Sequence, residues 1–294
     1  SLESVSYAAP ILEAIHLFRM PAFFMISGYF SALLLSREKG RLDYARDRLL
    51  RLGIPLLFAG VLFNLPLSSI IQNGPVQQGW FEYFFSAAWL GHLWFLSVLI
   101  IYSAVAALLL KHLKRILTLE IPYYWLAALL ILAILAPLSI RVGWVIDGLN
   151  AKLLFLDIVS TFEYAPYFIF GLVLFFQHSN MNLGKNLPNF LGATLLVGFL
   201  WFKVDLALLN DAAKFMMTSL FSFTLFSFFE RYFNKPATWK RNLAESSYTI
   251  YLIHQPIIIL LGFYLVKSTV NIHLQIILIM TITSIFALWL HFNL

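Results

Sequence analysis

Ionisable side chains are rare in this chain, and the first group lies in the stretch HLFRMPAFFMISGYF at residues 16–30. On an α-helix, which advances about 100° per residue, His16 and Ser27 fall on one stripe with Arg19 at its margin. Charged groups inside a membrane helix cost about 2.5–3.5 kcal/mol each on insertion scales, so this stripe should face other helices or water. His16 and Arg19 are therefore candidate catalytic residues. The alternative is that both lie near the membrane surface and extend toward water.

A second group opens the stretch HLWFLSVLIIYS at residues 92–103. On a helix, His92 shares a face with Ser103, whereas Trp94 lies on the opposite face. A histidine can move a proton near neutral pH, so His92 is a candidate for catalysis or for orienting a substrate, with a surface histidine as the alternative. Trp94 is a candidate substrate contact, although anchoring a helix at the membrane interface explains it more simply.

A third group occurs near the C-terminal end, in the stretch SSYTIYLIHQPI at residues 246–257. Ser247, Tyr251 and His254 fall on a single polar face of one helix. Pro256 then removes a backbone donor and loosens the turn before it. This face predicts a catalytic role for His254 and substrate contacts for Ser247 and Tyr251. A polar core with all its hydrogen bonds satisfied would show the same pattern.

The fourth group is basic. Arg46, Arg48 and Arg51 lie within six residues, and the last two are three positions apart, so on a helix their guanidinium groups point the same way. Guanidinium groups match phosphate oxygens in charge and geometry, so the three arginines are candidate substrate-binding residues. The alternative is that these charges only fix the orientation of the chain in the membrane.

The elements that carry these groups are membrane helices. The chain has 294 residues, of which 61% are hydrophobic and 12% charged, and its mean hydropathy is +0.83. A spanning helix needs about 20 mostly apolar residues. We predict an all-α, polytopic transmembrane bundle, since the apolar runs are continuous and do not alternate as in a β-barrel. The nine runs are 10–35, 53–72, 92–110, 122–140, 162–177, 188–204, 212–230, 246–266 and 274–292.

The loops between the runs differ in charge. Lysines and arginines number six in 37–51, three in 111–121, one in 178–187 and four in 231–245, against none, two, two and one in the alternate loops. The positive-inside rule therefore makes the first set cytoplasmic, with the N-terminus outside and the C-terminus inside. The net charge of +6 thus reflects topology, and no nucleic-acid partner is expected. The longest extramembrane pieces are expected at 37–51, 71–91 and 141–166.

No linker or soluble domain interrupts the chain, so residues 1–294 are expected to form one membrane-embedded domain. An N-terminus outside the membrane, with no signal-like stretch before it, suggests that about one N-terminal helix is missing and that the parent has ten. The last apolar run stops without a polar tail, which suggests truncation at that end too. The chain has no cysteine, which excludes disulfides and thiolate chemistry, and no metal site is predicted.

Four motifs in order and spacing resemble the membrane acyltransferase-3 family, especially its branch that modifies periplasmic glucans. They are FRMPAFFMISGYF (18–30), RLLRLGIP (48–55), HLWFLSVLI (92–100) and SSYTIYLIHQP (246–256). The resemblance implies a bacterial inner-membrane enzyme of about ten helices, with no bound cofactor. It would take an acetyl or succinyl group from cytoplasmic acyl-CoA, with succinyl-CoA as one candidate, and pass it to a hydroxyl of an extracytoplasmic carbohydrate.

The resemblance also implies residue roles. The family's Arg-x-x-Arg pair, thought to engage the acyl donor, falls on Arg48 and Arg51, and its C-terminal histidine helix falls on the helix of His254. The family's arginine followed eleven positions later by histidine has no counterpart here, so the main catalytic histidine is expected in the missing helix and His16, Arg19 and His254 in supporting roles. Leu99 stands where many relatives of the family have glutamate. The glucan-modifying branch also lacks this glutamate, so the resemblance assigns the chain to that branch. A transporter or flippase of glycans is the alternative function.

Overall fold

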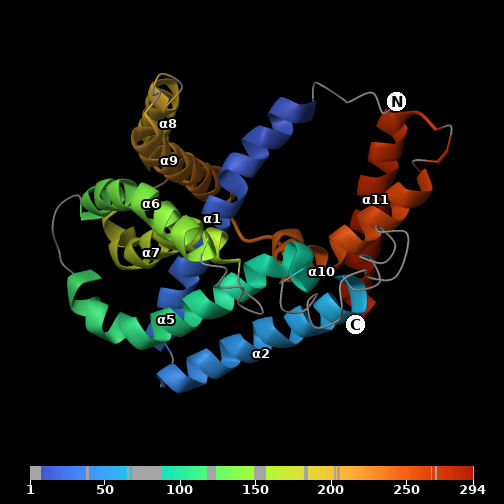
Figure 1. Cartoon of the computed structure of the whole chain (residues 1–294), viewed down its shortest axis with the longest axis horizontal. Coiled ribbons are helices and arrows are strands. Elements are labelled where there is room, and N and C mark those ends of the chain that lie inside the picture. The colour runs from blue at the N-terminus through green and yellow to red at the C-terminus, as the bar shows by residue number, and fades with distance from the viewer. Residues whose placement is uncertain are drawn as a thin grey trace. The chain divides into compact units, whose positions relative to one another are not determined.

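The computed structural model describes residues 8–37, 40–64, 67, 88–117, 124–148, 157–181, 185–201, 203, 206–265, 267, 268 and 270–293. All regular elements in these ranges are helices, which confirms the predicted all-α class (Figure 1). They are α1 (Ala8–Arg37), α2 (Arg41–Ala59), the π-helical turn η1 (Gly60–Asn64), the 3₁₀ segment η2 (Ala88–Leu93), α5 (Trp94–Leu117), α6 (Tyr124–Gly148), α7 (Ile158–Met181), α8 (Leu187–Trp201), α9 (Ala207–Phe233), α10 (Thr238–Leu265) and α11 (Ile272–Asn293).

Seven helices of the described chain are long and apolar enough to cross a membrane, namely α1, α5 together with part of η2, α6, α7, α9, α10 and α11. Each coincides with one of the nine expected runs. The run 188–204 corresponds to α8, a shorter apolar helix of 15 residues. The run 53–72 begins in α2 and η1 and then passes outside the described residues.

Several helices extend into stretches that were expected to be loops. α2 begins at Arg41, so the basic segment 37–51 is mostly helical, and the expected outer stretch 141–166 contains the end of α6 and the start of α7. Most of the expected outer stretch 71–91 lies outside the described residues, which resume at Ala88. The physical reason is that a helix satisfies its own backbone hydrogen bonds in water as in lipid, so it does not stop where polar side chains begin.

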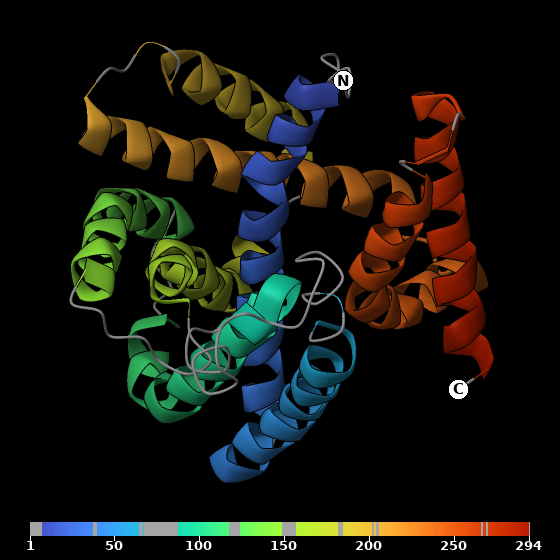
Figure 2. The same ribbon diagram turned by 45° about the vertical axis from the view of Figure 1, so that its right-hand side comes forward.

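The chain divides into two compact units, which are described separately. The first comprises residues 1–48, 98–151 and 157–234 and contains α1, most of α5, and α6 to α9. In it α7 packs against α1 and α6, while α9 packs against α1, α6 and α8. Figure 2 shows α9 crossing α1, with α8 alongside α9. Aromatic rings fill its interior, and the Phe24 ring stacks on Tyr164 at 4.9 Å between centroids.

Two glycines set the crossing of α1 and α7. A Cβ atom added to Gly28 would overlap the backbone carbonyl oxygen of Phe168, and one added to Gly171 would overlap that of Met25. Small residues allow membrane helices to approach this closely, and packing is the main force that joins helices in lipid. Gly28 therefore serves the close packing of α1 against α7.

Helix α9 carries buried hydroxyl groups on several sides, and three of the five in the described residues are satisfied within the helix itself. Their positions are Thr218, Ser219, Ser222, Thr224 and Ser227. The Thr218, Ser222 and Thr224 hydroxyls donate to the carbonyl oxygens four residues earlier, at 2.8–3.0 Å. These three side chains let a neighbouring helix approach without leaving their hydroxyls unpaired, whereas the buried Ser219 and Ser227 hydroxyls have no hydrogen-bond partner among the described residues. Thr224 also contacts the Thr194 hydroxyl of α8 at 3.1 Å.

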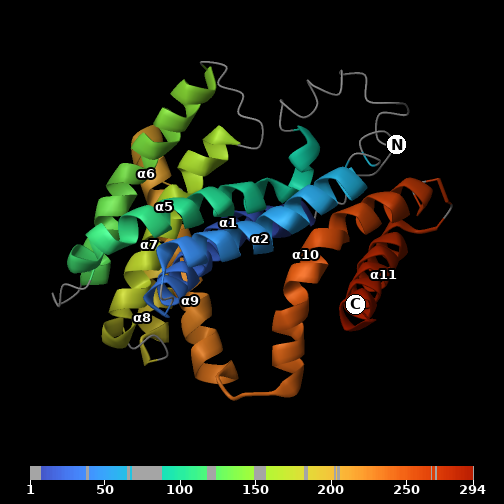
Figure 3. The same cartoon turned by 90° about the horizontal axis from the view of Figure 1, so that it is seen from below.

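The second unit comprises residues 49–97, 152–156 and 235–294. In it α11 packs against α10, as Figure 3 shows, and η1 packs against η2. The buried Asn64 side chain donates to the carbonyl oxygens of Trp89 and Leu90, at 2.9 and 2.8 Å. Gly91 follows with φ +46°, a backbone conformation that side-chain-bearing residues rarely adopt. These contacts fix the start of α5, where His92 lies.

Candidate functional site

Three sequence-predicted residues of the second unit meet in space. His92 is the next-to-last residue of η2, and Tyr251 and His254 lie one turn apart on α10. The Tyr251 hydroxyl donates to the His92 carbonyl oxygen at 2.7 Å. The two imidazole rings stand nearly perpendicular with centroids 5.6 Å apart, and each ring centroid lies 5.9 Å from the centroid of the Tyr251 ring. The sequence predicted a polar face on α10, and the structure adds His92 to that face.

The hydrogen bonds of His254 assign its tautomer. Its Nδ1 lies 2.7 Å from the carbonyl oxygen of Tyr251 and 3.1 Å from that of Ile250. Carbonyl oxygens only accept, so Nδ1 carries the hydrogen and the lone pair of the neutral ring is on Nε2. Among the described residues, this Nε2 has no hydrogen-bond partner. In His92 the nitrogen that approaches a backbone carbonyl oxygen is Nε2 and not Nδ1. It lies 3.4 Å from the Leu252 carbonyl oxygen, which is long for a hydrogen bond.

Two other predicted substrate contacts do not join this cluster. Ser247 is exposed on α10, and its hydroxyl donates to the Ala244 carbonyl oxygen at 2.7 Å. Trp94 is half-buried, and its ring meets the edge of Phe95 at 6.5 Å between centroids. Phe95 in turn contacts Tyr251 at 5.7 Å, so Trp94 lies one side chain away from the histidines.

The basic residues of α2 differ in environment. Arg46 is exposed. Arg48 is half-buried, with its guanidinium carbon 5.7 Å from the centroid of the Tyr44 ring. Within the described part of the chain, the buried Nε of Arg48 and the buried Tyr44 hydroxyl have no hydrogen-bond partner. Arg51 follows one turn later with an exposed side chain, and its backbone carbonyl oxygen accepts from the Tyr248 hydroxyl at 3.1 Å.

The structure says less about Arg19 and His16, the two candidate residues of α1. Arg19 is exposed on α1. His16 belongs to α1, but its side chain lies outside the described part of the structure. In the described ranges, no group of three or more His, Asp or Glu side chains could hold a metal ion.

The first unit contains a cavity of about 570 Å³, which the sequence did not predict. Its size falls in the range of small-molecule sites, about 300–1,000 Å³. Four helices line it: α1, the first turns of α7, the last residue of α8 and the early part of α9. The lining residues are Leu17, Pro21, Glu163, Tyr164, Tyr167, Trp201 and Lys214.

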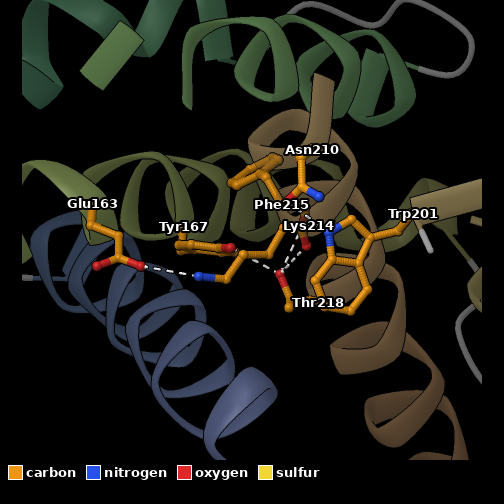
Figure 4. A network of polar contacts seen from close by, with 7 residues as sticks. All are labelled: Glu163, Tyr167, Trp201, Asn210, Lys214, Phe215 and Thr218. Atoms are coloured by element: carbon orange, nitrogen blue, oxygen red, sulfur yellow. Dashed lines mark hydrogen bonds and ion pairs between the residues drawn. The ribbon is translucent and has the colours of Figure 1, made fainter. Parts of the chain in front are cut away.

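Side chains of three helices hold the cavity's polar groups in place (Figure 4). The Lys214 ammonium of α9 forms an ion pair with the Glu163 carboxylate of α7 at 3.4 Å. The Trp201 indole N–H donates to the Asn210 side-chain oxygen at 3.0 Å. The Tyr167 hydroxyl contacts the Thr218 hydroxyl at 2.9 Å.

A sequence signal for this cavity was present but divided between helices. Glu163 and Lys214 each lie within the first three residues of an apolar run, where a charge is ordinarily assigned to the adjacent loop. Helical periodicity compares positions within one helix. It does not reveal this ion pair, because the two residues are 51 positions apart and belong to different helices. A carboxylate and an ammonium flanking different apolar runs are the pattern that could have indicated the pair.

Comparison with known proteins shows the family to which the chain belongs. A sequence profile described as an acyltransferase domain, acyltransferase family 3, matches residues 2–292. The chain belongs to this acyltransferase family. Its relatives include the glucans biosynthesis protein C of Salmonella schwarzengrund and of Salmonella typhi, each 28% identical over 86% of this chain and 72% of the relative. The same protein of Salmonella paratyphi B is 29% identical over the same shares. No solved structure matches the chain.

Family membership and the apolar helices together make this a multi-pass membrane acyltransferase that uses an acyl donor. The match covers nearly the whole chain, so the helices that carry the histidine cluster, the α2 arginines and the cavity all belong to the acyltransferase domain. An enzyme of this class forms and breaks covalent bonds, which favours the acyltransferase interpretation over the transporter or flippase.

Proposed function

We propose that this enzyme transfers an acetyl or succinyl group from cytoplasmic acyl-CoA to a hydroxyl of a glucan outside the cytoplasmic membrane. The observation that carries the proposal is the acyltransferase match over residues 2–292 with relatives named for glucan biosynthesis. The transmembrane direction rests on the charge of the loops, because the arginine-rich segment of α2 belongs to the set assigned to the cytoplasm.

The reaction is an acyl exchange. The acceptor hydroxyl oxygen attacks the thioester carbonyl carbon, the C–S bond breaks, and coenzyme A leaves as the thiol. A base takes the hydroxyl proton, and hydrogen-bond donors stabilise the negative charge that develops on the carbonyl oxygen. Among the described residues, the His254 Nε2 is suited to accept a hydrogen bond from the acceptor hydroxyl, because its Nδ1 hydrogen is held by the backbone.

The α2 arginines suit the phosphates of the donor. Arg48 lies against the Tyr44 ring and is only half-buried, so its guanidinium group can present N–H donors to a phosphate oxygen. Arg51 lies one turn further along α2 and Arg46 less than one turn before Arg48. This supports the donor-binding role that the family resemblance assigns to Arg48 and Arg51.

Supporting roles are proposed for the remaining candidates. His92, Tyr251 and Trp94 would border the acceptor hydroxyl beside His254, and the exposed Ser247 would contribute at most indirectly. Arg19 and His16 lie on the half of α1 nearer the outer face by the loop charges. Arg19 could pair with the carboxylate of a succinyl group.

The test is acyl incorporation into periplasmic glycans by cells that express the full-length gene or its Arg48→Ala, Arg51→Ala double variant. Each charged hydrogen bond contributes about 1.5–3 kcal/mol, so the KM for acyl-CoA should rise by at least an order of magnitude. In purified protein, the acceptor KM should change little, because the arginines are assigned to the donor alone.

The matched control is the Arg231→Ala, Arg241→Ala double variant. It removes the same charge from exposed positions near the α9–α10 connection, a loop assigned to the same side of the membrane. Equal loss in both double variants would point to topology or expression as the cause. Wild-type incorporation by the α2 variant would remove its donor-binding role, and absence of acyl groups on glycans from wild-type cells would refute the proposed function.

A further inference from the structure

We propose that the cavity of the first unit, between Glu163, Lys214 and Trp201, binds a sugar ring of the glucan acceptor. The inference rests on the proposed function for the identity of the acceptor as a glucan. None of the described residues that line this cavity belongs to the histidine cluster or to the α2 arginines.

The charges of the cavity favour a neutral polyhydroxylated ligand. The described part of its lining includes one carboxylate and one ammonium, which form an ion pair at 3.4 Å, so the charges of these residues cancel. Glu163 can only accept hydrogen bonds and Lys214 can only donate them. Neighbouring hydroxyls of one sugar ring can satisfy both, because a hydroxyl donates and accepts. The pair is partly accessible, with side-chain exposures of 29% for Glu163 and 37% for Lys214.

The rest of the lining is aromatic and apolar. Trp201, Tyr164, Leu17 and Pro21 surround the ion pair. Sugars combine hydroxyl groups at their edge with an apolar face of C–H groups, and aromatic rings pack against such a face. The Trp201 ring is fixed by the hydrogen bond to Asn210, so a ligand meets a wall that is already ordered.

The position of the cavity along the helices fits an acceptor that arrives from outside. Glu163 follows the loop before α7, while Trp201 and Lys214 flank the loop between α8 and α9. Both loops belong to the set that the lysine and arginine distribution places outside the cytoplasm. Leu17 and Pro21 lie in the half of α1 that enters from the same side.

A neighbouring ion pair gives a matched comparison. Arg141 of α6 and Asp211 of α9 lie 3.3 Å apart, and their side chains are 43% and 30% exposed. Asp211 is three residues before Lys214 on α9, yet neither partner of this pair lines the cavity. A purely structural role for interhelical ion pairs would make the two pairs equivalent.

The experiment measures binding without an acyl donor. The full-length protein in lipid nanodiscs is titrated calorimetrically with cello-, laminari- and sophoro-oligosaccharides as neutral glucan probes. We expect at least one series to bind, with Kd raised tenfold or more by Glu163→Gln and by Trp201→Ala. Trp201→Phe should retain part of the affinity because it keeps an aromatic face. Asp211→Asn should bind as the wild type does, and thermal unfolding of each variant checks that it is folded.

The outcomes separate this inference from the proposed function. Acyl transfer with an acceptor KM that is unchanged in folded Glu163→Gln and Trp201→Ala proteins overturns the cavity assignment and leaves the function intact. Oligosaccharide binding that depends on these residues, without any acyl transfer, supports the cavity and refutes the function. If no glucan series binds, or if Asp211→Asn weakens binding as much as Glu163→Gln does, the sugar site is refuted.

Discussion

At the scale of single residues, His254 has the most defined chemical state. Its Nδ1 hydrogen is held by the Tyr251 carbonyl oxygen at 2.7 Å, so the ring is oriented by its own helix. The neighbouring Tyr251 hydroxyl holds the backbone of His92, which links the two histidines through one side chain. Orientation of one imidazole nitrogen by the backbone while the other faces the reaction is a common arrangement for a proton acceptor.

Two amide substitutions distinguish the nitrogens of His254. His254→Asn can keep a donor near Nδ1 but removes Nε2, whereas His254→Gln places an amide near the Nε2 position. We expect His254→Asn to lower kcat on the order of 10²-fold, the lower end of the contribution of acid–base groups, and His254→Gln to lower it less. Steady-state acyl transfer by purified full-length enzyme measures both.

His273→Asn is the control, because this exposed histidine lies at the start of α11 in the same unit. It should retain wild-type kcat. A His254→Asn enzyme as active as the wild type would show that Nε2 takes no part in the reaction.

Part of the candidate site could be predicted from the sequence. The α10 face of Tyr251 and His254 follows from helical periodicity, since both residues belong to one helix. The addition of His92 depends on a contact across 159 residues, and the Glu163–Lys214 pair on one across 51, which periodicity does not encode. Ser247 lies on the expected helix but satisfies its hydroxyl locally, at the Ala244 carbonyl oxygen, which periodicity does not encode either.

At the scale of elements, the crossing of α1 and α7 depends on two residues without side chains. Gly28 and Gly171 each face backbone of the other helix, so the helices approach as closely as their main chains allow. This contact holds Pro21 and Leu17 of α1 near the first turns of α7, where Glu163 and Tyr164 line the cavity.

Gly171→Ala should therefore destabilise the protein. The added Cβ would overlap the Met25 carbonyl oxygen, and overpacking of this kind costs about 1–3 kcal/mol, or more where backbone must move. Thermal unfolding of detergent-solubilised protein should show a lower Tm. Gly192→Ala is the matched control, because a Cβ there meets no atom within 4 Å and alanine favours the helix by up to about 1 kcal/mol. Equal Tm values for the two variants would contradict the close crossing.

The sequence predicted the existence of the elements better than their limits. Every expected apolar run that falls in the described ranges is helical, but α2 and α10 begin in charged segments, at Arg41 and Thr238. Hydropathy reports where lipid contacts a helix, whereas hydrogen bonding determines where the helix starts. The π-helical turn η1 and the left-handed Gly91 depend on the Asn64 contacts, which are distant in sequence.

At the scale of the whole molecule, function depends on which helix ends face the cytoplasm. The charge distribution predicts that the α2 arginines lie inside and the loops beside the cavity outside, as we propose. Donor and acceptor would then approach from opposite faces of the membrane. This arrangement is the central feature of the proposed transmembrane transfer, and it can be tested without measuring activity.

Single cysteines can report this topology, because the 294 residues contain none. Lys203→Cys and Ser268→Cys change exposed residues of expected outer loops, and Lys235→Cys changes an exposed residue of an expected cytoplasmic loop. We expect a membrane-impermeant maleimide to label the first two in spheroplasts, whereas Lys235→Cys should react only after the membrane is opened. Labelling of Lys235→Cys in sealed spheroplasts, or failure of both outer sites to react, would reverse or refute the orientation.

The α1–α7 crossing also bears on how sequences of this family can diverge. When two side chains touch, a larger residue on one helix can be offset by a smaller residue on the other. At Gly28 and Gly171 the atoms in the way belong to the main chain, which no substitution can shorten. Homologous enzymes that keep this crossing should therefore conserve glycine at each position independently, and paired replacements, the usual sign of contacting residues, should be absent there.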